Sequence, residues 1–146
     1  MATKKTVRVQ ATLGEGFTIE SKMGNHVVYV DQPKEQGGAD TGPTPLQYLF
    51  LAVAGCIGSV ARIIANQKRL PLRSMEITVE GDVDLERLLG KNLTSRAGFE
   101  SVRLSVKMDA DMNAQEKKHF LEEVESRCPV SENLANMTPV SIQLAE

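Results

Sequence analysis

The sequence lacks the features that mark nucleic-acid-binding and membrane-spanning proteins. Its 17 Lys and Arg and 19 Asp and Glu give a formal net charge of −2. Because the basic residues are scattered, they form no stripe that could follow a phosphate backbone. The apolar run from Tyr48 to Ala61 is shorter than the roughly 20 residues that a membrane span needs. We therefore expect neither nucleic acid nor a membrane as a partner, and the apolar run predicts a buried core helix.

The sequence also has few cysteines and no apolar segment at its start. Lys4 and Lys5 lead into the alternating stretch 6–9, which differs from a secretory signal, so we expect a cytoplasmic protein. Two cysteines in a reducing compartment are more often catalytic, redox-active or simply buried than a permanent disulfide. The length of 146 residues, with 41% hydrophobic and 25% charged residues, predicts one folded domain over residues 1–146.

Strand and turn patterns fill the first part of the chain. Apolar residues alternate with polar ones over residues 7–19, apart from a glycine turn at 14–16, and a second turn at 24–25 precedes an apolar stretch at 27–30. This pattern predicts a three-stranded antiparallel meander. The segment Gln32 to Pro45 is rich in glycine and proline, which predicts a loop and a candidate wall of a site.

A long helix is predicted from Pro45 to about Lys68. Thr44 is the expected N-cap, Pro45 suits the first helical position, and Gln47 can close a capping box. At the other end, Lys68 suits the negative end of the helix dipole, and Pro71 cannot continue the helix.

Further strands are predicted after this helix. Apolar residues alternate over 75–79 and again over 102–108, as they do in half-buried strands. The polar stretch 85–98 lies between them and fits either a short helix or a flexible hairpin tip.

The last part of the sequence predicts two helices and a strand. Helical spacing of apolar residues over 113–127 predicts an amphipathic helix, and the pair Cys128-Pro129 starts a short helix through about Ala135. Alternation over 140–144 predicts a closing strand. Together these elements give an α+β fold with antiparallel sheets.

The two thiols have different predicted surroundings. Cys56 lies inside the apolar helix, where burial raises the pKa of a thiol, so it is either a small core residue or a reactive group. Cys128 is the expected N-cap of the short helix. In that position its sulfur faces unpaired N–H groups, which lower the pKa of a thiol from about 8.5.

Metal and cofactor sites are not indicated. The cysteines lie too far apart in sequence for a CxxC motif or a local zinc site, and only His26 and His119 could add to them. Each histidine is interpreted as a surface or strand residue. We therefore expect no metal and no cofactor.

Several motifs together resemble the OsmC/Ohr family of organic hydroperoxide resistance proteins. They are Gly42-Pro43-Thr44-Pro45, the small-residue apolar helix that carries Cys56, and Cys128-Pro129-Val130-Ser131. The resemblance implies an OsmC-like α/β fold in an intertwined homodimer with the long helices at its centre. It also implies that Cys56 is the peroxidatic thiol and Cys128 the resolving thiol, with a dithiol or a lipoylated protein as the reductant.

The sequence departs from this family pattern at the residues that hold the first thiolate. Active members hold the first thiolate with an arginine and a glutamate, whereas this chain has Leu46 and Gln47 where the glutamate lies and no arginine in the preceding loop. Gln47 and Arg96 are the candidate supporting residues, with Arg8 and Arg62 as weaker ones.

Three functions fit these observations. The first is a thiol-dependent peroxidase that reduces organic hydroperoxides in oxidative-stress defence. The second is a non-catalytic binding protein for a small hydrophobic ligand, which the missing arginine and glutamate motivate. The third is a redox-sensitive structural dimer, which would form a reversible disulfide without turnover.

Overall fold

The computed structural model describes residues 2–145, and the chain divides into two compact units, residues 1–49 and 50–146. Helix α1 begins in the first unit and continues through the second. The prediction of one domain over the whole chain stays a prediction.

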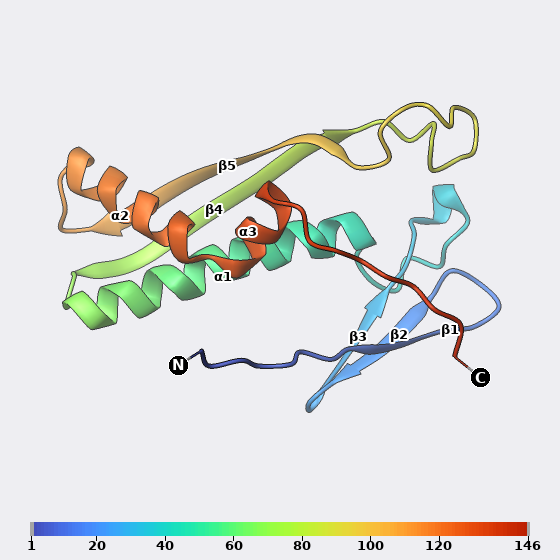
Figure 1. The fold of residues 1–146 in the computed structure, drawn as a ribbon, viewed down its shortest axis with the longest axis horizontal. Coiled ribbons are helices and arrows are strands. Elements are labelled where there is room, and N and C mark those ends of the chain that lie inside the picture. The colour runs from blue at the N-terminus through green and yellow to red at the C-terminus, as the bar shows by residue number, and fades with distance from the viewer. Residues whose placement is uncertain (1, 146) are drawn as a thin grey trace. The chain divides into compact units, whose positions relative to one another are not determined.

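The first unit holds the predicted three-stranded antiparallel sheet. Strands β1 (Gln10–Leu13), β2 (Ile19–Met23) and β3 (His26–Val30) pair in the order β1-β2-β3 (Figure 1). The first strand begins later than expected. Gln10 pairs with Lys22, so the last residue of β2, Met23, lies opposite Val9, and residues 7 and 8 have no β2 residue opposite them.

A buried carboxylate organises the segment that follows β3. Asp31 is 1% exposed, and it accepts hydrogen bonds from the hydroxyls of Thr18 and Thr41 and from the backbone N–H groups of Gln32, Ala39 and Thr41. The Thr41 hydroxyl contributes most, and these donors together hold the pKa of Asp31 well below its usual range. The loop is therefore tied to one ionised side chain.

The same segment contains one short helix and one close backbone approach. The 3₁₀ helix η1 (Lys34–Gln36) lies in the predicted loop. A Cβ atom at Gly42 would lie 2.2 Å from the carbonyl oxygen of Tyr29, so only glycine fits at this position.

Helix α1 (Pro45–Lys68) has the predicted bounds. The Gln47 N–H donates to Thr44 Oγ1 at 3.3 Å, and the Thr44 N–H donates to Gln47 Oε1 at 2.9 Å. The predicted capping box is thus confirmed. By length and composition alone α1 could cross a membrane, but one face of the helix carries buried side chains of the core: Val53, Ile57, Val60, Ala61, Ile64 and Ala65.

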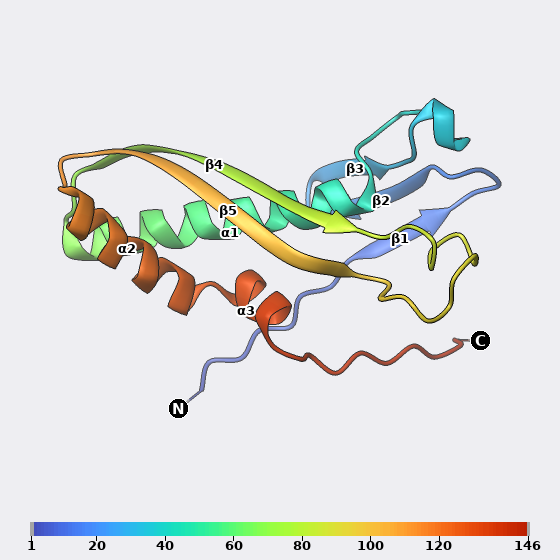
Figure 2. The ribbon, with the colours of Figure 1, turned by 90° about the horizontal axis from the view of Figure 1, so that it is seen from above.

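The second unit packs a long hairpin against three helices. Strands β4 (Leu72–Val83) and β5 (Phe99–Ala110) pair antiparallel and are longer than predicted (Figure 2). Helix α2 (Ala114–Arg127) begins with a capping box between Asn113 and Glu116, and α3 (Pro129–Ala135) follows at once. Both helices confirm the sequence prediction.

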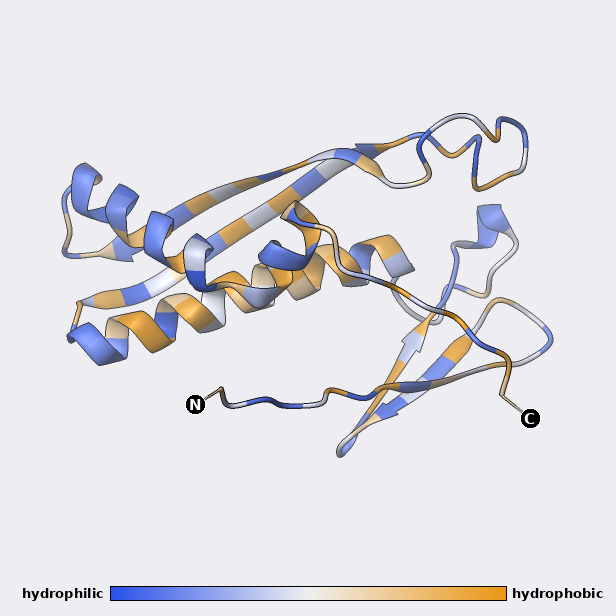
Figure 3. Ribbon diagram, viewed as in Figure 1, coloured by the Kyte–Doolittle hydropathy of each residue, from blue (hydrophilic) through white to orange (hydrophobic). Residues whose placement is uncertain are grey.

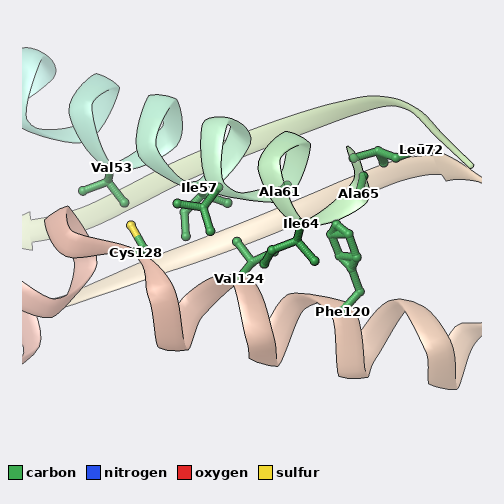
Figure 4. Close-up of a cluster of buried hydrophobic side chains, with 10 residues drawn as sticks. Val53, Ile57, Ala61, Ile64, Ala65, Leu72, Phe120, Val124 and Cys128 are labelled. Carbon is green, nitrogen blue, oxygen red and sulfur yellow. The ribbon is translucent and has the colours of Figure 1, made fainter. Parts of the chain in front are cut away.

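The core of the second unit lies between α1 and α2. Figure 4 shows Phe120 and Val124 of α2 pointing toward Ile57 and Ile64 of α1. Helix α1 is largely hydrophobic along its length, whereas α2 is mostly hydrophilic outside its inner face (Figure 3). The core therefore depends on α1 more than on any other element.

The predicted strand over residues 140–144 is wrong. Within the described part of the chain, residues 137–145 form no helix or strand, and Val140, Ile142 and Leu144 are 84%, 96% and 90% exposed. A strand needs a neighbour for its backbone N–H and C=O groups, and this segment has none in the single chain. Residues 140–144 alternate as in a strand, but within the described residues of the single chain no other strand pairs with them.

Candidate active site

The two thiols meet in the core of the second unit. Cys56 lies on α1 and Cys128 lies between α2 and α3, and their Sγ atoms are 2.9 Å apart, with the Cys128 thiol donating. Neither forms a disulfide. In Figure 4 the Cys128 sulfur points toward α1. Two side chains that are 72 positions apart in sequence are thus in direct contact.

The backbone around Cys128 fixes the direction of its side chain. Cys128 has extended backbone angles, φ −85° and ψ 109°, and it ends α2 and caps α3, with Pro129 at the first position of α3. Its Sγ accepts a hydrogen bond from the Ser131 N–H at 3.4 Å. This confirms the predicted N-cap, and at 1% exposure the side chain is buried.

Cys56 is half-buried and packs at the edge of the core cluster. Burial raises the pKa of the Cys56 thiol, and the neighbouring Cys128 thiol raises it further. A hydrogen bond from the Val130 backbone N–H acts in the opposite direction but is outweighed. The net direction is upward, so the Cys56 thiol needs further stabilisation of its charged form to react at neutral pH.

Two cavities lie between α1 and β5 and are lined by neighbours of Cys56 in the chain, though not by either cysteine. The first, of about 310 Å³, and the second, of about 260 Å³, share the side chains of Val102, Leu104, Glu125 and Ser131. Ile57 lines the first and Val53 the second, and both flank Cys56 on α1. Both cavities run along β5; the first is lined mainly by apolar side chains, whereas the second is lined by several polar and charged ones.

Arg96, one of the two supporting candidates from the sequence, lines the second cavity. It lies on the β4–β5 connection and is exposed. Among the residues that line these two cavities, Arg96 is the only cation. It shares this cavity with Val53, one turn before Cys56 on α1, which distinguishes it from the other arginines.

Gln47, the other supporting candidate, is engaged at the start of α1. Its side-chain oxygen accepts from Thr44, which accounts for its presence as a helix cap. Arg62 donates to the carbonyl oxygens of Leu72 and Arg73 at 2.7 and 3.3 Å. Arg62 therefore ties α1 to β4.

Sequence reasoning missed two groups at this site. Glu125 lines both cavities, and its place on an amphipathic helix gave no reason to select it. The Val130 N–H contacts Cys56, but a backbone group is the same at every residue except proline and leaves no signal in sequence. Within residues 2–145, no cluster of three or more His, Cys, Asp and Glu side chains is placed to hold a metal ion.

Comparison with known proteins identifies the architecture. The model of the family described as OsmC-like protein matches residues 37–143. An OsmC-like protein from Mycoplasma pneumoniae is 22% identical, with a TM-score of 0.79 over 92% of this chain and 91% of that one. A search of curated proteins found no match.

Two further similar structures are of proteins named for resistance to organic hydroperoxides. The organic hydroperoxide resistance protein OsmC from Legionella pneumophila is 22% identical, with a TM-score of 0.68 over 91% of both chains. The organic hydroperoxide resistance protein OhrB of Bacillus subtilis is 21% identical, with a TM-score of 0.62 over 91% of this chain and 93% of its own. These likenesses confirm the predicted α+β fold with antiparallel sheets.

Proposed function

The chain belongs to the OsmC-like protein family, and on this premise we propose that it is a thiol-dependent peroxidase that reduces organic hydroperoxides in oxidative-stress defence. The observation that carries the proposal is the 2.9 Å contact between the Cys56 and Cys128 Sγ atoms. The names of the related structures from Legionella pneumophila and Bacillus subtilis, both organic hydroperoxide resistance proteins, support the choice of substrate class.

In the proposed first step, the Cys56 thiolate attacks the distal oxygen of a hydroperoxide ROOH. An S–O bond forms as the O–O bond breaks, and the leaving alkoxide takes up a proton to give ROH. Cys56 becomes a sulfenic acid, so its sulfur has lost two electrons and the peroxide has gained them. Cys56 is the better choice for this role because it is half-buried, whereas Cys128 is buried.

In the second step, Cys128 attacks the sulfenic sulfur of Cys56. The S–S bond forms, and the oxygen leaves as water with the thiol proton. Since a disulfide is about 2.05 Å long and the sulfurs already lie 2.9 Å apart, this step needs only a small movement. An external dithiol or a lipoylated protein then reduces the disulfide by thiol exchange, which restores both thiols.

Arg96 and Gln47 are the supporting residues in this proposal. A cation near Cys56 favours its thiolate, and Arg96 is the cation that lines the second cavity. The Val130 N–H adds a hydrogen bond in the same direction. Gln47 contributes by fixing the start of α1, the helix that carries Cys56.

The alternative function is a binding protein for a small hydrophobic ligand. The first cavity, which is lined mainly by apolar side chains with Glu125 and Ser131 at its wall, favours it, because apolar clefts with a few polar groups are typical ligand sites. In this alternative the thiols are incidental and hydroperoxide is not consumed.

We also propose that the protein is a cytoplasmic homodimer. One face of α1 is exposed in the single chain, with Leu51 and Ile63 at 63% and 48%, and a Cβ at Gly55 would meet nothing within 4 Å. A helix that is apolar on its exposed face gains stability by burial against a second copy. The unpaired alternating segment 140–144 offers a strand to the same partner.

The test of the proposed function is intact-mass spectrometry of the reduced protein after brief exposure to one equivalent of cumene hydroperoxide. We expect a rapid loss of two hydrogens in the wild type and none in Cys56→Ser. Turnover is then followed with excess hydroperoxide and dithiothreitol. An unchanged wild-type mass over many minutes would reject the peroxidase and favour the binding protein.

A further inference from the structure

The connection between β4 and β5 ends in a tip that is both basic and apolar. Residues 87–98, called the β4–β5 tip below, contain Arg87, Lys91 and Arg96 and no acidic residue, and the acidic Asp84 and Glu86 of the same connection lie just before them. Leu88, Leu89 and Leu93 of the tip are 76%, 61% and 67% exposed. The tip thus gathers positive charge and exposed leucines in one short segment.

The tip is held in this form by hydrogen bonds within the β4–β5 connection. The Leu89 N–H donates to the Leu85 carbonyl at 3.0 Å, and the Lys91 N–H donates to the Glu86 carbonyl at 2.8 Å. The Arg87 guanidinium donates to the carbonyl oxygens of Leu93 and Ser95. The leucines are therefore presented by an ordered turn, whose left-handed position, at φ 72°, is filled by Gly90.

We propose that the β4–β5 tip docks on an anionic lipid surface. Exposed leucines beside Lys91 and Arg96 match the interfacial region of a bilayer, where apolar side chains enter the acyl boundary and basic ones meet lipid phosphates. A second copy of the tip fits less well, because two tips would bring like charges together. The basic residues of the tip therefore favour an anionic lipid surface over a second copy of the chain.

This docking is peripheral and requires no membrane-spanning segment, but it departs from the sequence expectation that a membrane is not a partner. It also goes beyond the proposed peroxidase, because it depends on the tip and not on the thiols. A lipid-docked tip would bring the protein to the phase in which apolar hydroperoxides dissolve. Binding can be measured without any peroxide, which keeps the two proposals separable.

The absence of tryptophan allows a direct test with the full-length protein. Leu89→Trp places a single indole in the tip, and Leu13→Trp is the matched control because Leu13 is equally exposed, at 61%. Each variant is titrated with vesicles of phosphatidylglycerol and phosphatidylcholine, and with phosphatidylcholine alone. We expect a blue shift of the emission for Leu89→Trp with anionic vesicles, a weaker one with neutral vesicles, and none for Leu13→Trp.

Sedimentation with the same vesicles tests the charge. Each basic residue near an anionic surface contributes about 1 kcal/mol, or roughly fivefold in affinity. Lys91→Glu removes one positive charge and adds one negative charge, so it should weaken binding roughly 25-fold. Lys118→Glu makes the same charge change on α2, where Lys118 is exposed, and should have a much smaller effect. The proposal is overturned if the wild type does not sediment with anionic vesicles, or if the two variants bind equally well.

Discussion

The Sγ atoms of Cys56 and Cys128 lie 2.9 Å apart, and the Cys128 sulfur also accepts the Ser131 N–H. One sulfur therefore contacts both its proposed redox partner and the first turn of α3. This arrangement supports a division of work between the thiols, because Cys56 is the half-buried member and Cys128 the buried one.

The first prediction concerns the resolving thiol. In Cys128→Ser, Cys56 should still react once with hydroperoxide, but the sulfenic acid should persist because no thiol lies beside it. Mass spectrometry should then detect an added oxygen and a dimedone adduct at Cys56, and turnover with dithiothreitol should fall at least tenfold. Formation of the adduct in wild type and variant alike would argue against Cys128 as the resolving residue.

The pH dependence of Cys56 oxidation should show a raised pKa. Burial and the adjacent Cys128 thiol raise the pKa of Cys56 above its usual value, so the reactive thiolate is the minor form at neutral pH. The rate with cumene hydroperoxide should therefore increase with pH, about tenfold per unit below the pKa, and level off above about 8.5, the value of a free thiol. A rate already constant from pH 6 upward would contradict this direction.

A cation near Cys56 would lower the pKa of its thiol, and Arg96→Gln tests whether Arg96 has this effect. If Arg96 stabilises the thiolate, the variant's pH profile should move to higher pH. Arg96→Lys should restore part of the shift because it keeps the charge. A profile unchanged in both variants would assign Arg96 no role at Cys56.

The core prediction compares two apolar side chains of different burial. Ile64 is completely buried, whereas Leu88 is 76% exposed. Ile64→Ala should lower the free energy of unfolding by about 2–5 kcal/mol, because it removes buried methyl groups and leaves a cavity. Leu88→Ala should change it by less than about 0.5 kcal/mol. Urea denaturation monitored by circular dichroism measures both.

The proposed dimer makes a prediction at Gly55. A side chain at this position meets nothing within the single chain, and replacing glycine inside a helix favours the helix by up to about 1 kcal/mol. Gly55→Leu should thus leave the chain folded but separate two closely packed α1 helices. Light scattering should give a dimer mass for the wild type and for the control Glu122→Leu, and a monomer mass for Gly55→Leu. A dimeric Gly55→Leu would reject the central packing of α1.

Acid stability should depend on Asp31. Its pKa is held well below the usual range, chiefly by the Thr41 hydroxyl. The stabilisation is therefore present above the unfolded-state pKa of about 3.9 and is lost as the pH falls below it. Asp31→Asn should lower the melting temperature at pH 7 and have a smaller effect at pH 3. Asp40→Asn, in the same loop and exposed, is the control and should change little at either pH.

The parts of the fold that local chemistry determines could be predicted from the sequence. Thr44, Pro45 and Gln47 lie within one turn, and their capping preferences placed the start of α1 correctly. Cys128 and Pro129 placed the start of α3 in the same way. In both cases the interacting groups are neighbours in the chain, so the sequence order itself carries the information.

The parts that depend on distant partners could not be predicted in this way. The contact between Cys56 and Cys128 followed only from resemblance to a family, since no local pattern joins residues so far apart. The strand expected at 140–144 has the right alternation, but pairing depends on a neighbouring strand that the single chain does not supply. Polar residues 85–98 form ordered turns with no periodic pattern from which to predict them.

Because the Cys128 sulfur contacts both Cys56 and the Ser131 N–H, oxidation of the thiols should affect the backbone of α3. When the thiol enters a disulfide, its sulfur is no longer free to move with the first turn of α3, and the hydrogen bond from Ser131 must adjust. The exchange of the Ser131 amide hydrogen with solvent should therefore differ between the reduced and the oxidised protein. A single backbone amide would then report the redox state of a buried sulfur, and α3 would transmit that state toward the surface of the protein.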